Sequence, residues 1–310
     1  MATQTLAEAA KLITNQVVRG VAEDIITLNP IFAAMPFSSY TGQAIVANRE
    51  NALGDVQSLA VGGTITAKAA ATFTQFTFKA ETIIGDAEMN GLVQVQSDAA
   101  GVDQLATEIG SKAKSVGRQF QNGLATGTGT SPQLNSMHSL CDASQYTTAS
   151  VGQALAFSLL DELCDLVKAK DGQVDWSMMP ARTMRSYKAL LRALGGTAGD
   201  WIVTLPDGRT TIGYEGIPIF KNEWLSTAET ANGALLTTGA LASVWAGVWD
   251  DGSQKIGLAA IHPAGAPAGI AVEEVGLKET ADEAIWRVKL YANFSLFNRR
   301  GLARLTSINN

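Results

Sequence analysis

Apolar and polar positions alternate most clearly in two regions of the chain. Thr74, Phe76 and Phe78 alternate with polar neighbours, a period of two that predicts a strand. Residues 43–49 fit a partner strand, and the stretch between the two is rich in Gly, Ala, Ser and Thr. We therefore expect residues 41–85 to form a long β-hairpin with a loose tip. A lone two-stranded ribbon has no core, so it must bury its faces elsewhere, as against another subunit.

A helical period replaces this alternation over residues 97–125. Ser97 or Asp98 is the expected N-cap, and the Gly- and Thr-rich segment 127–132 ends the helix. The apolar stripe with a spacing of 3.6 residues consists of Val102, Leu105, Ile109, Ala113, Val116, Phe120 and Leu124.

Two more helices are expected in the middle of the chain. Residues 150–170 carry a leucine stripe, and Ser150 with Gln153 matches a capping box at its start. A buried strand over 174–179 follows, and Pro180 can open a third helix that ends at Gly195-Gly196. In this third helix, we expect the core to receive Met184, Tyr187, Leu191 and Leu194.

Strands dominate from residue 200 onward. The turn residues 206–208 predict a hairpin between 202–205 and 209–212. Residues 217–220 read as a strand whose Pro218 indicates a sheet edge or a strand start. Uncharged residues 230–249 fit buried strands with a turn better than a membrane span, and residues 286–296 alternate as a half-buried strand. Helices and strands without a steady βαβ rhythm indicate an α+β fold.

The first 36 residues read as an arm. An apolar stripe at roughly helical spacing runs to Ile25, and Asn29-Pro30 and Met35-Pro36 then stop any helix. Such a stripe needs a surface to lie on.

Composition points in the same direction. The 310 residues carry a formal net charge of −6, which argues against binding nucleic acid over the whole surface. Only 17% of residues are charged, against about 25% in typical soluble domains, so we infer that other chains cover much of the surface. Cys141 and Cys164 form no disulfide framework, which indicates a reduced, intracellular setting. No signal peptide is visible in the first 30 residues.

No catalytic, cofactor or metal motif emerges. His138 and His262 read as satisfied loop histidines. Glu273 and Glu274 would point to opposite faces of a strand, and residues 250–253 read as a turn rather than a cation site. We expect a protein that is not an enzyme and needs no cofactor or metal ion.

The C-terminal part of the chain is basic, with no acidic residue after Glu283. We favour a solvent-exposed sheet face with intersubunit ion pairs over a surface that faces DNA. The residues concerned are Arg287, Lys289, Arg299, Arg300 and Arg304.

The order of these elements resembles the major capsid proteins of tailed bacteriophages, with the Hong Kong 97-type fold, over nearly the whole chain. Three local phrases support the resemblance: 174–180 with the helix after it, the Gly-x-Pro strand of 213–219, and the closing strand of 284–305.

The resemblance implies a division of the chain. It has an N-terminal arm (1–40), an extended β-hairpin loop (41–85), a peripheral domain with a long spine helix (86–149 and 266–310) and an axial domain (150–265). It also implies self-assembly into hexamers and pentamers of an icosahedral shell that encloses double-stranded DNA without sequence-specific binding. Portal, scaffolding and decoration proteins are the implied partners, and no membrane is involved. The implied location is the virion capsid, assembled in the bacterial host cytoplasm.

No scaffolding segment precedes the arm, so the resemblance implies a separate scaffold or none. Some members of the family crosslink a loop lysine to a neighbour's asparagine. Lys68 and Lys79 lie in the corresponding loop, but no partner can be matched, so we expect noncovalent assembly.

Within the loop we expect intersubunit contacts and hinges. The expected contact residues are Arg49, Glu50, Asp55, Lys68, Phe76, Phe78, Lys79 and Glu81. The glycines that would let the hairpin swing are Gly42, Gly54, Gly62, Gly63 and Gly85.

Three other interpretations stay open. An encapsulin-type nanocompartment has the same fold with enzyme cargo in place of a genome. An enzyme with an unrecognised site would run as a small oligomer, and a tail protein would form tubes.

Overall fold

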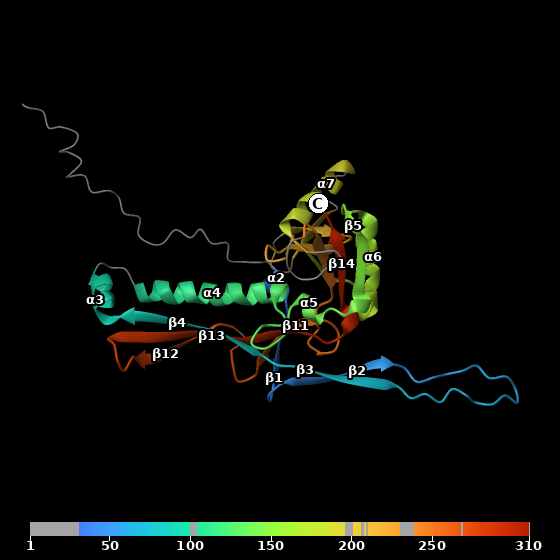
Figure 1. Ribbon diagram of the computed structural model, residues 1–310, viewed down its shortest axis with the longest axis horizontal. Helices are drawn as coiled ribbons and strands as arrows, with labels where there is room; N and C mark the ends of the chain where they lie inside the picture. Colours follow the sequence, from blue (N-terminus) through green and yellow to red (C-terminus); the bar gives the residue numbers. More distant parts are fainter. Residues whose placement is uncertain are drawn as a thin grey trace, which may run out of the picture.

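The computed structural model describes residues 31–99, 104–195, 201–205, 208, 210–229, 239–267 and 269–309. A compact body carries two extensions that leave it in opposite directions (Figure 1). One is an arm of sheet and helix, and the other is a two-stranded ribbon. The predicted helix before residue 30, the stretch 230–238 and Asp207 lie outside the described residues.

A five-stranded sheet forms the arm of sheet and helix, called the sheet arm below. Its centre is the 14-residue strand β13, which confirms the predicted strand over 286–296. Strand β4 pairs antiparallel with β13 along one edge. Strands β12 and β11 pair antiparallel with successive parts of the other edge of β13, and β1 pairs with β11 in parallel. The strands are β1 (Phe37–Tyr40), β4 (Glu81–Asn90), β11 (Leu258–Pro263), β12 (Ala271–Leu277) and β13 (Glu283–Leu296).

Two helices accompany this sheet where one was expected. They are α3 (Gly91–Ala99) and α4 (Gln104–Thr126). The backbone N–H of Gly91 donates to the carbonyl of Asp282 at 3.0 Å, so the chain turns helical directly after β4. Ser97 and Asp98 therefore lie inside α3, and the prediction that one of them caps the long helix was wrong. The stripe of α4 is confirmed at Val116, Phe120 and Leu124, which are buried.

The body is built on a seven-stranded sheet in the order β5-β14-β10-β6-β9-β8-β7. These strands are β5 (Tyr146–Gln153), β6 (Trp176–Met179), β7 (Ile202–Thr204), β8 (Thr210–Tyr214), β9 (Ile217–Lys221), β10 (Ala242–Gly247) and β14 (Leu302–Ile308). The predicted strand near 174–179 and the hairpin of β7 and β8 are confirmed. Pro218 is the second residue of β9, near the strand start, and β9 is not at a sheet edge because it lies between β6 and β8.

The helix expected over 150–170 begins later and has no capping box. Gln153 ends β5, and α6 (Phe157–Leu166) starts at the N-cap Ala156 without a side-chain cap. The residues of β5 include β-branched Thr147, Thr148 and Val151, which suit a strand paired in parallel with β14. The pairing of β5 with β14 therefore overrides the local capping-box pattern, which wrongly predicted a helix start at Ser150.

The third helix, α7 (Ala181–Ala193), uses Pro180 as its N-cap, one position before the predicted role. Met184 and Tyr187 are buried as expected, but Leu194 is 58% exposed because it already lies past the helix end. Gly195 follows with φ of 65°, the left-handed turn that ends many helices.

Short helices complete the described fold: α2 (Ile31–Ala34), α5 (Met137–Leu140) and the 3₁₀ turns Ala143–Gln145, Ala169–Gly172 and Arg299–Gly301. The ribbon consists of β2 (Ile45–Ala52) and β3 (Thr72–Phe78), paired antiparallel, as the hairpin prediction requires.

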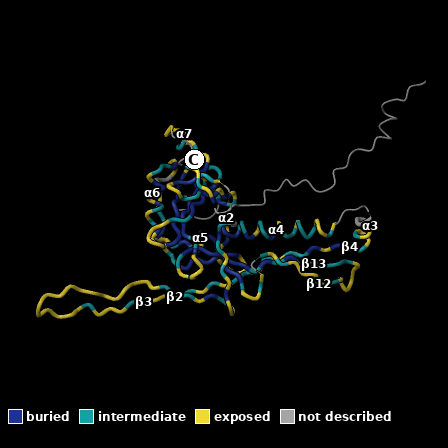
Figure 2. Tube along the Cα trace, turned by 180° about the vertical axis from the view of Figure 1, so that it is seen from behind, coloured by how far each residue is buried: buried dark blue, intermediate teal, exposed yellow. Residues whose placement is uncertain are grey.

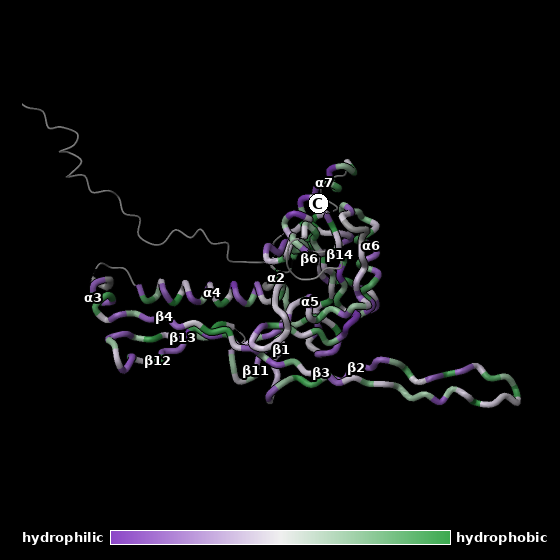
Figure 3. The backbone as a smooth tube through the Cα atoms, viewed as in Figure 1, coloured by the Kyte–Doolittle hydropathy of each residue, from purple (hydrophilic) through white to green (hydrophobic). Residues whose placement is uncertain are grey.

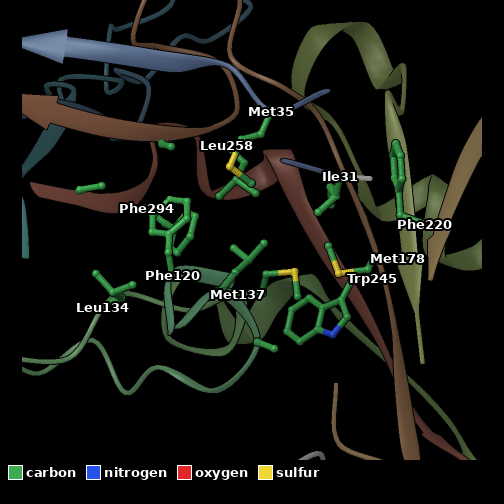
Figure 4. Packing of buried hydrophobic residues seen from close by; sticks show 14 of the residues in the cluster. Ile31, Met35, Phe120, Leu134, Met137, Met178, Phe220, Trp245, Leu258 and Phe294 are labelled. Atoms are coloured by element: carbon green, nitrogen blue, oxygen red, sulfur yellow. The ribbon is translucent and has the colours of Figure 1, made fainter. Parts of the chain in front are cut away.

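One hydrophobic cluster joins the two large sheets (Figure 4). Phe120 of α4 stacks on Phe294 of β13 with ring centroids 4.6 Å apart. The same cluster contains Met178 and Trp245 from the seven-stranded sheet. Arm and body therefore share a continuous core.

The sheets divide the chain differently from the expected ranges. Strand β14 falls in the expected range 266–310, yet it pairs with β5 and β10 of the body. Strand β11 falls in the expected range 150–265, yet it pairs with β13 of the arm. The chain therefore passes between the sheet arm and the body several times, and the sequence alone does not predict these crossings.

Candidate assembly surfaces

The outer half of the ribbon has no contact with the body. Every residue from Asn51 to Thr66 is exposed, and this part of the ribbon stands clear of the molecule (Figure 2). Hydrophobic residues recur along it (Figure 3). Leu53 is 78% and Val56 94% exposed, and Ile65 and Phe73 are also open to solvent. An exposed apolar surface of this kind marks a site of interaction with another molecule.

Arg49 fixes the base of the ribbon to the body. Its guanidinium donates to the carbonyl oxygen of Leu296 at 3.1 Å and to that of Phe297 at 3.2 Å. The same group lies 4.2 Å from the centroid of the Phe76 ring, a cation–π contact. Partial burial lowers the pKa of Arg49, in keeping with a charge held against the body.

Aromatic packing supports the same base. Phe78 meets Phe297 edge to face at 6.1 Å, and Ile45 is buried in the same small cluster. The Tyr40 hydroxyl accepts a hydrogen bond from the backbone N–H of Ala80 at 3.0 Å. The ribbon is therefore attached to the body at its base, whereas its outer half is free, so we describe it as a lever.

We expect Arg49→Ala to loosen the ribbon without unfolding the protein. Loss of the Arg49 hydrogen bonds should speed amide exchange in β2 and β3 by about tenfold, at a cost of about 1–2 kcal/mol in unfolding free energy. Hydrogen exchange with mass spectrometry measures this change. Lys68→Ala, in the exposed outer half, is the control and should leave exchange at the base unchanged. Equal exchange rates in the wild type and Arg49→Ala would refute the anchoring role.

The expected contact residues divide into two groups. Besides Arg49, Phe76 and Phe78, the structure gives Lys79 and Glu81 partners in the same chain: they pair with each other at 3.4 Å. Glu81 also accepts from the Ser131 hydroxyl at 3.0 Å. Glu50, Asp55 and Lys68 are exposed. An intersubunit role is therefore proposed below for the exposed group and the apolar outer half.

Gln57, which the sequence analysis did not single out, orders the ribbon tip. Its side-chain oxygen accepts from the backbone N–H groups of Thr66 and Ala67 at 2.7 and 2.6 Å. Its amide donates to the carbonyl of Thr64 at 3.1 Å. The tip is braced across the hairpin rather than loose.

Two of the expected hinge glycines have a left-handed backbone. Gly42 has φ of 89° and Gly62 of 83°, a region that other residues resist. Gly42 lies between β1 and the ribbon, and Gly62 lies at the tip. Gly85 is elsewhere: it sits inside β4, paired with Val288, so its place in the ladder does not suit a hinge.

A second exposed apolar surface lies at the far end of the arm. We call it the arm-end surface. It comprises Leu92 and Val95 of α3 and Val275 and Leu277 of β12. Leu277 is 75% and Val95 67% exposed. The sequence did not predict this surface, because the exposure of these residues depends on where α3 and β12 lie at the end of the sheet.

Arg304 lies in a buried ionic cluster, not on a wet surface or a surface that faces DNA. Its side chain is 2% exposed and donates to Glu229 at 3.1 Å and to the Ser243 hydroxyl at 3.0 Å. The guanidinium also lies 4.9 Å from the Trp245 ring. The expectation for Arg304 was therefore wrong, because β14 lies between β5 and β10 and is buried on both faces.

His138 belongs to the same cluster and is not a loop histidine. It lies in α5, edge to face with Trp245 at 4.8 Å, with its Nε2 3.7 Å from Glu229. Burial, assisted by the Arg304 charge, lowers the pKa of His138 to about 3. The imidazole is therefore neutral at physiological pH. Burial raises the pKa of Glu229.

This neutral histidine predicts a pH dependence of stability. Between about pH 6.5 and pH 3 the unfolded chain binds a proton at His138 that the folded chain rejects, so acidification favours unfolding. Relative to His138→Gln, the wild type should lose about 2 kcal/mol of unfolding free energy from about pH 7 to pH 5. Urea unfolding of the unassembled subunit measures this difference. Parallel curves for the two proteins would rule out a buried neutral His138.

The other basic residues near the C-terminus make ion pairs within the chain. Arg287 donates twice to Asp86, at 2.9 Å each, and Lys289 pairs with Glu273 at 2.5 Å. Arg299 lies 3.8 Å from Asp142. The expected intersubunit pairs are therefore formed within the sheet arm and the body, and Arg300 alone of this set remains exposed.

Among the residues that the structure describes, His, Cys, Asp and Glu form no group of three that could hold a metal ion. The carboxylate of Asp250 accepts backbone N–H groups of Gly252, Gln254, Lys255 and Ile256, which confirms the predicted turn. Over the described helices, none is both long and apolar enough to span a bilayer.

Solved structures match the whole chain. Neither the family models nor the curated proteins give a match. The capsid of cyanophage A-1(L) is 13% identical, with a TM-score of 0.72 over 99% of this chain and 100% of that one. The capsid of a native GTA particle is 9% identical, with a TM-score of 0.68 and full coverage of both chains. The SrpI encapsulin of Synechococcus elongatus PCC 7942 is 13% identical, with a TM-score of 0.73 over 100% of this chain and 97% of that one.

The chain has the Hong Kong 97-type capsid fold. Full coverage in both directions means that the ribbon, the sheet arm and the body are all parts of this fold. At 9–13% identity the likeness is one of architecture. The phage capsid and the encapsulin match almost equally well.

Proposed function

We propose that the chain is the major capsid protein of a tailed double-stranded DNA phage. Copies assemble into hexamers and pentamers of an icosahedral shell around the genome, and the protein is not an enzyme. The observation that carries the proposal is the free ribbon: an ordered, partly apolar lever on a fold that phage capsids share over its full length. The exposed apolar side chains of this ribbon are buried only when a neighbouring copy covers them.

The arm-end surface is the complementary feature. It is apolar and exposed at the opposite end of the molecule from the ribbon tip (Figure 1). The ribbon of one copy, including Glu50, Asp55 and Lys68, lies over the sheet arm of the next copy. Because each copy both donates and receives, the contact is heterologous and propagates around a closed shell.

The acidic composition fits a container whose wall does not attract DNA, with the genome supplied by a packaging machine. Portal, scaffolding and decoration proteins are the partners in this proposal, and the shell forms in the cytoplasm of a bacterial host. The axial role belongs to the body and the peripheral role to the sheet arm.

An encapsulin shell is the second candidate, because the SrpI encapsulin has a TM-score of 0.73 with this chain. The contents of the particle separate the two. Particles isolated from cells that make this chain should protect double-stranded DNA from nuclease. Shells that contain a packaged enzyme and no DNA would favour the encapsulin, and a small soluble oligomer would refute both.

A further inference from the structure

Two helices on the body carry opposite charge. Helix α7 contains Arg182, Arg185, Lys188 and Arg192 and no acidic residue. Their spacing of three to four residues places them on one face, opposite the buried Met184 and Tyr187. On a chain with net charge −6, this basic face is an exception.

Helix α6 is the opposite case. It contains Asp161, Glu162 and Asp165 and no basic residue. All three are exposed, while Leu159, Leu160 and Leu163 face the core. The acidic face is therefore as segregated as the basic one.

The two faces do not satisfy each other within one copy. Helix α6 lies against β5 and β14, and Phe157 at its start meets Tyr187 of α7 edge to face with ring centroids 6.2 Å apart. The two helices are therefore neighbours that pack into one core cluster, with their charged faces pointing away from it. Figure 1 shows α7 at the top of the body and α6 along its side. Within the described part of the chain, neither face forms an ion pair. Instead Asp161 accepts from the Tyr214 hydroxyl, and Arg182 donates to the carbonyl of Ala240.

We propose that the acidic face of α6 in one copy contacts the basic face of α7 in the next copy around each ring of the shell. This inference rests on the proposed function, because it assumes that copies form rings. A head-to-tail contact joins two different surfaces and closes when the rotation allows, which suits two unlike charged faces on one domain. Complementary charge orients the copies and excludes like-charged contacts.

A nucleic acid on the basic face is a different partner for α7. That partner leaves the acidic face of α6 without a role, whereas a second copy of the chain occupies both. The charge pattern therefore favours the second copy.

Charge reversal with rescue tests the contact. Arg185→Glu with Arg192→Glu, and separately Glu162→Lys with Asp165→Lys, should each raise the protein concentration for half-maximal assembly by about tenfold. The combination of all four should return it to within about threefold of the wild type. Light scattering follows assembly, and thermal unfolding verifies that each variant is folded. Lys221→Glu, in the same body but on neither helix, is the control.

Failure of the inference and of the proposed function look different. If the wild type forms closed shells but the fourfold variant is no better than either reversal, the proposed contact is overturned. An effect of the α7 reversal alone, together with lost retention of DNA, also overturns it and assigns the basic face to nucleic acid. A wild type that forms no shell overturns the proposed function itself.

Discussion

A chain whose ribbon is cut short should fold normally and fail to assemble. Ala52 and Thr72 oppose each other in the ladder, so an Asn-Gly turn can replace residues 53–71. Arg49, Phe76 and Phe78 stay in place, and almost all the removed residues are exposed. The midpoint of thermal unfolding should therefore change little, while assembly falls by at least about a hundredfold, as expected when apolar contact area of this size is lost at every interface. Sedimentation velocity and electron microscopy measure the two outcomes.

A full-length variant separates ribbon chemistry from ribbon length. Leu53→Ser, Val56→Ser and Val61→Ser keep the hairpin and remove exposed apolar side chains only. This variant should also assemble poorly. Lys68→Ser is the matched control on the same ribbon and should assemble with a smaller loss. Closed shells from the shortened chain would contradict the donated ribbon.

Arg304→Met should be the most destabilising single substitution at the centre of the body. It leaves Glu229 charged and unpaired in a site where both side chains are 2% exposed. Removing one partner of a buried pair costs about 3–5 kcal/mol of unfolding free energy. Chemical unfolding of the unassembled subunit measures the loss.

The double variant provides the internal check. Arg304→Met together with Glu229→Gln removes both charges and should recover a large part of the stability that Arg304→Met loses. The defect of Arg304→Met should also be smaller at low pH, because burial raises the pKa of Glu229 and protonation removes the unpaired charge. A double variant as unstable as the sum of both single variants would refute the pairing.

Sequence periodicity was sufficient for the elements with strong local patterns. The ribbon, the α4 stripe and β13 all follow from alternation or helical spacing that packing then preserves. The capping signal at Ser150 failed because parallel pairing with β14, more than 150 residues away in sequence, outweighs it. Local rules cannot weigh a partner that the chain brings in from such a distance.

The candidate surfaces were predictable only in part. An apolar hairpin without a core pointed to the ribbon, but which of its residues are free depended on Arg49 reaching the carbonyls of Leu296 and Phe297. Arg304 belongs to a basic run in sequence, yet it is buried because β14 joins the body and pairs with β10 and β5. The charged residues of α6 and α7 can be read from the sequence. Whether they form faces that another copy can contact depends on where the two helices pack on the sheet.

Electron microscopy of the purified full-length protein tests the central claim most directly. We predict closed icosahedral shells in which the ribbon of each copy lies on the sheet arm of a neighbouring copy. Separate monomers at the same concentration, with residues 53–71 protected from amide exchange by their own chain, would contradict it.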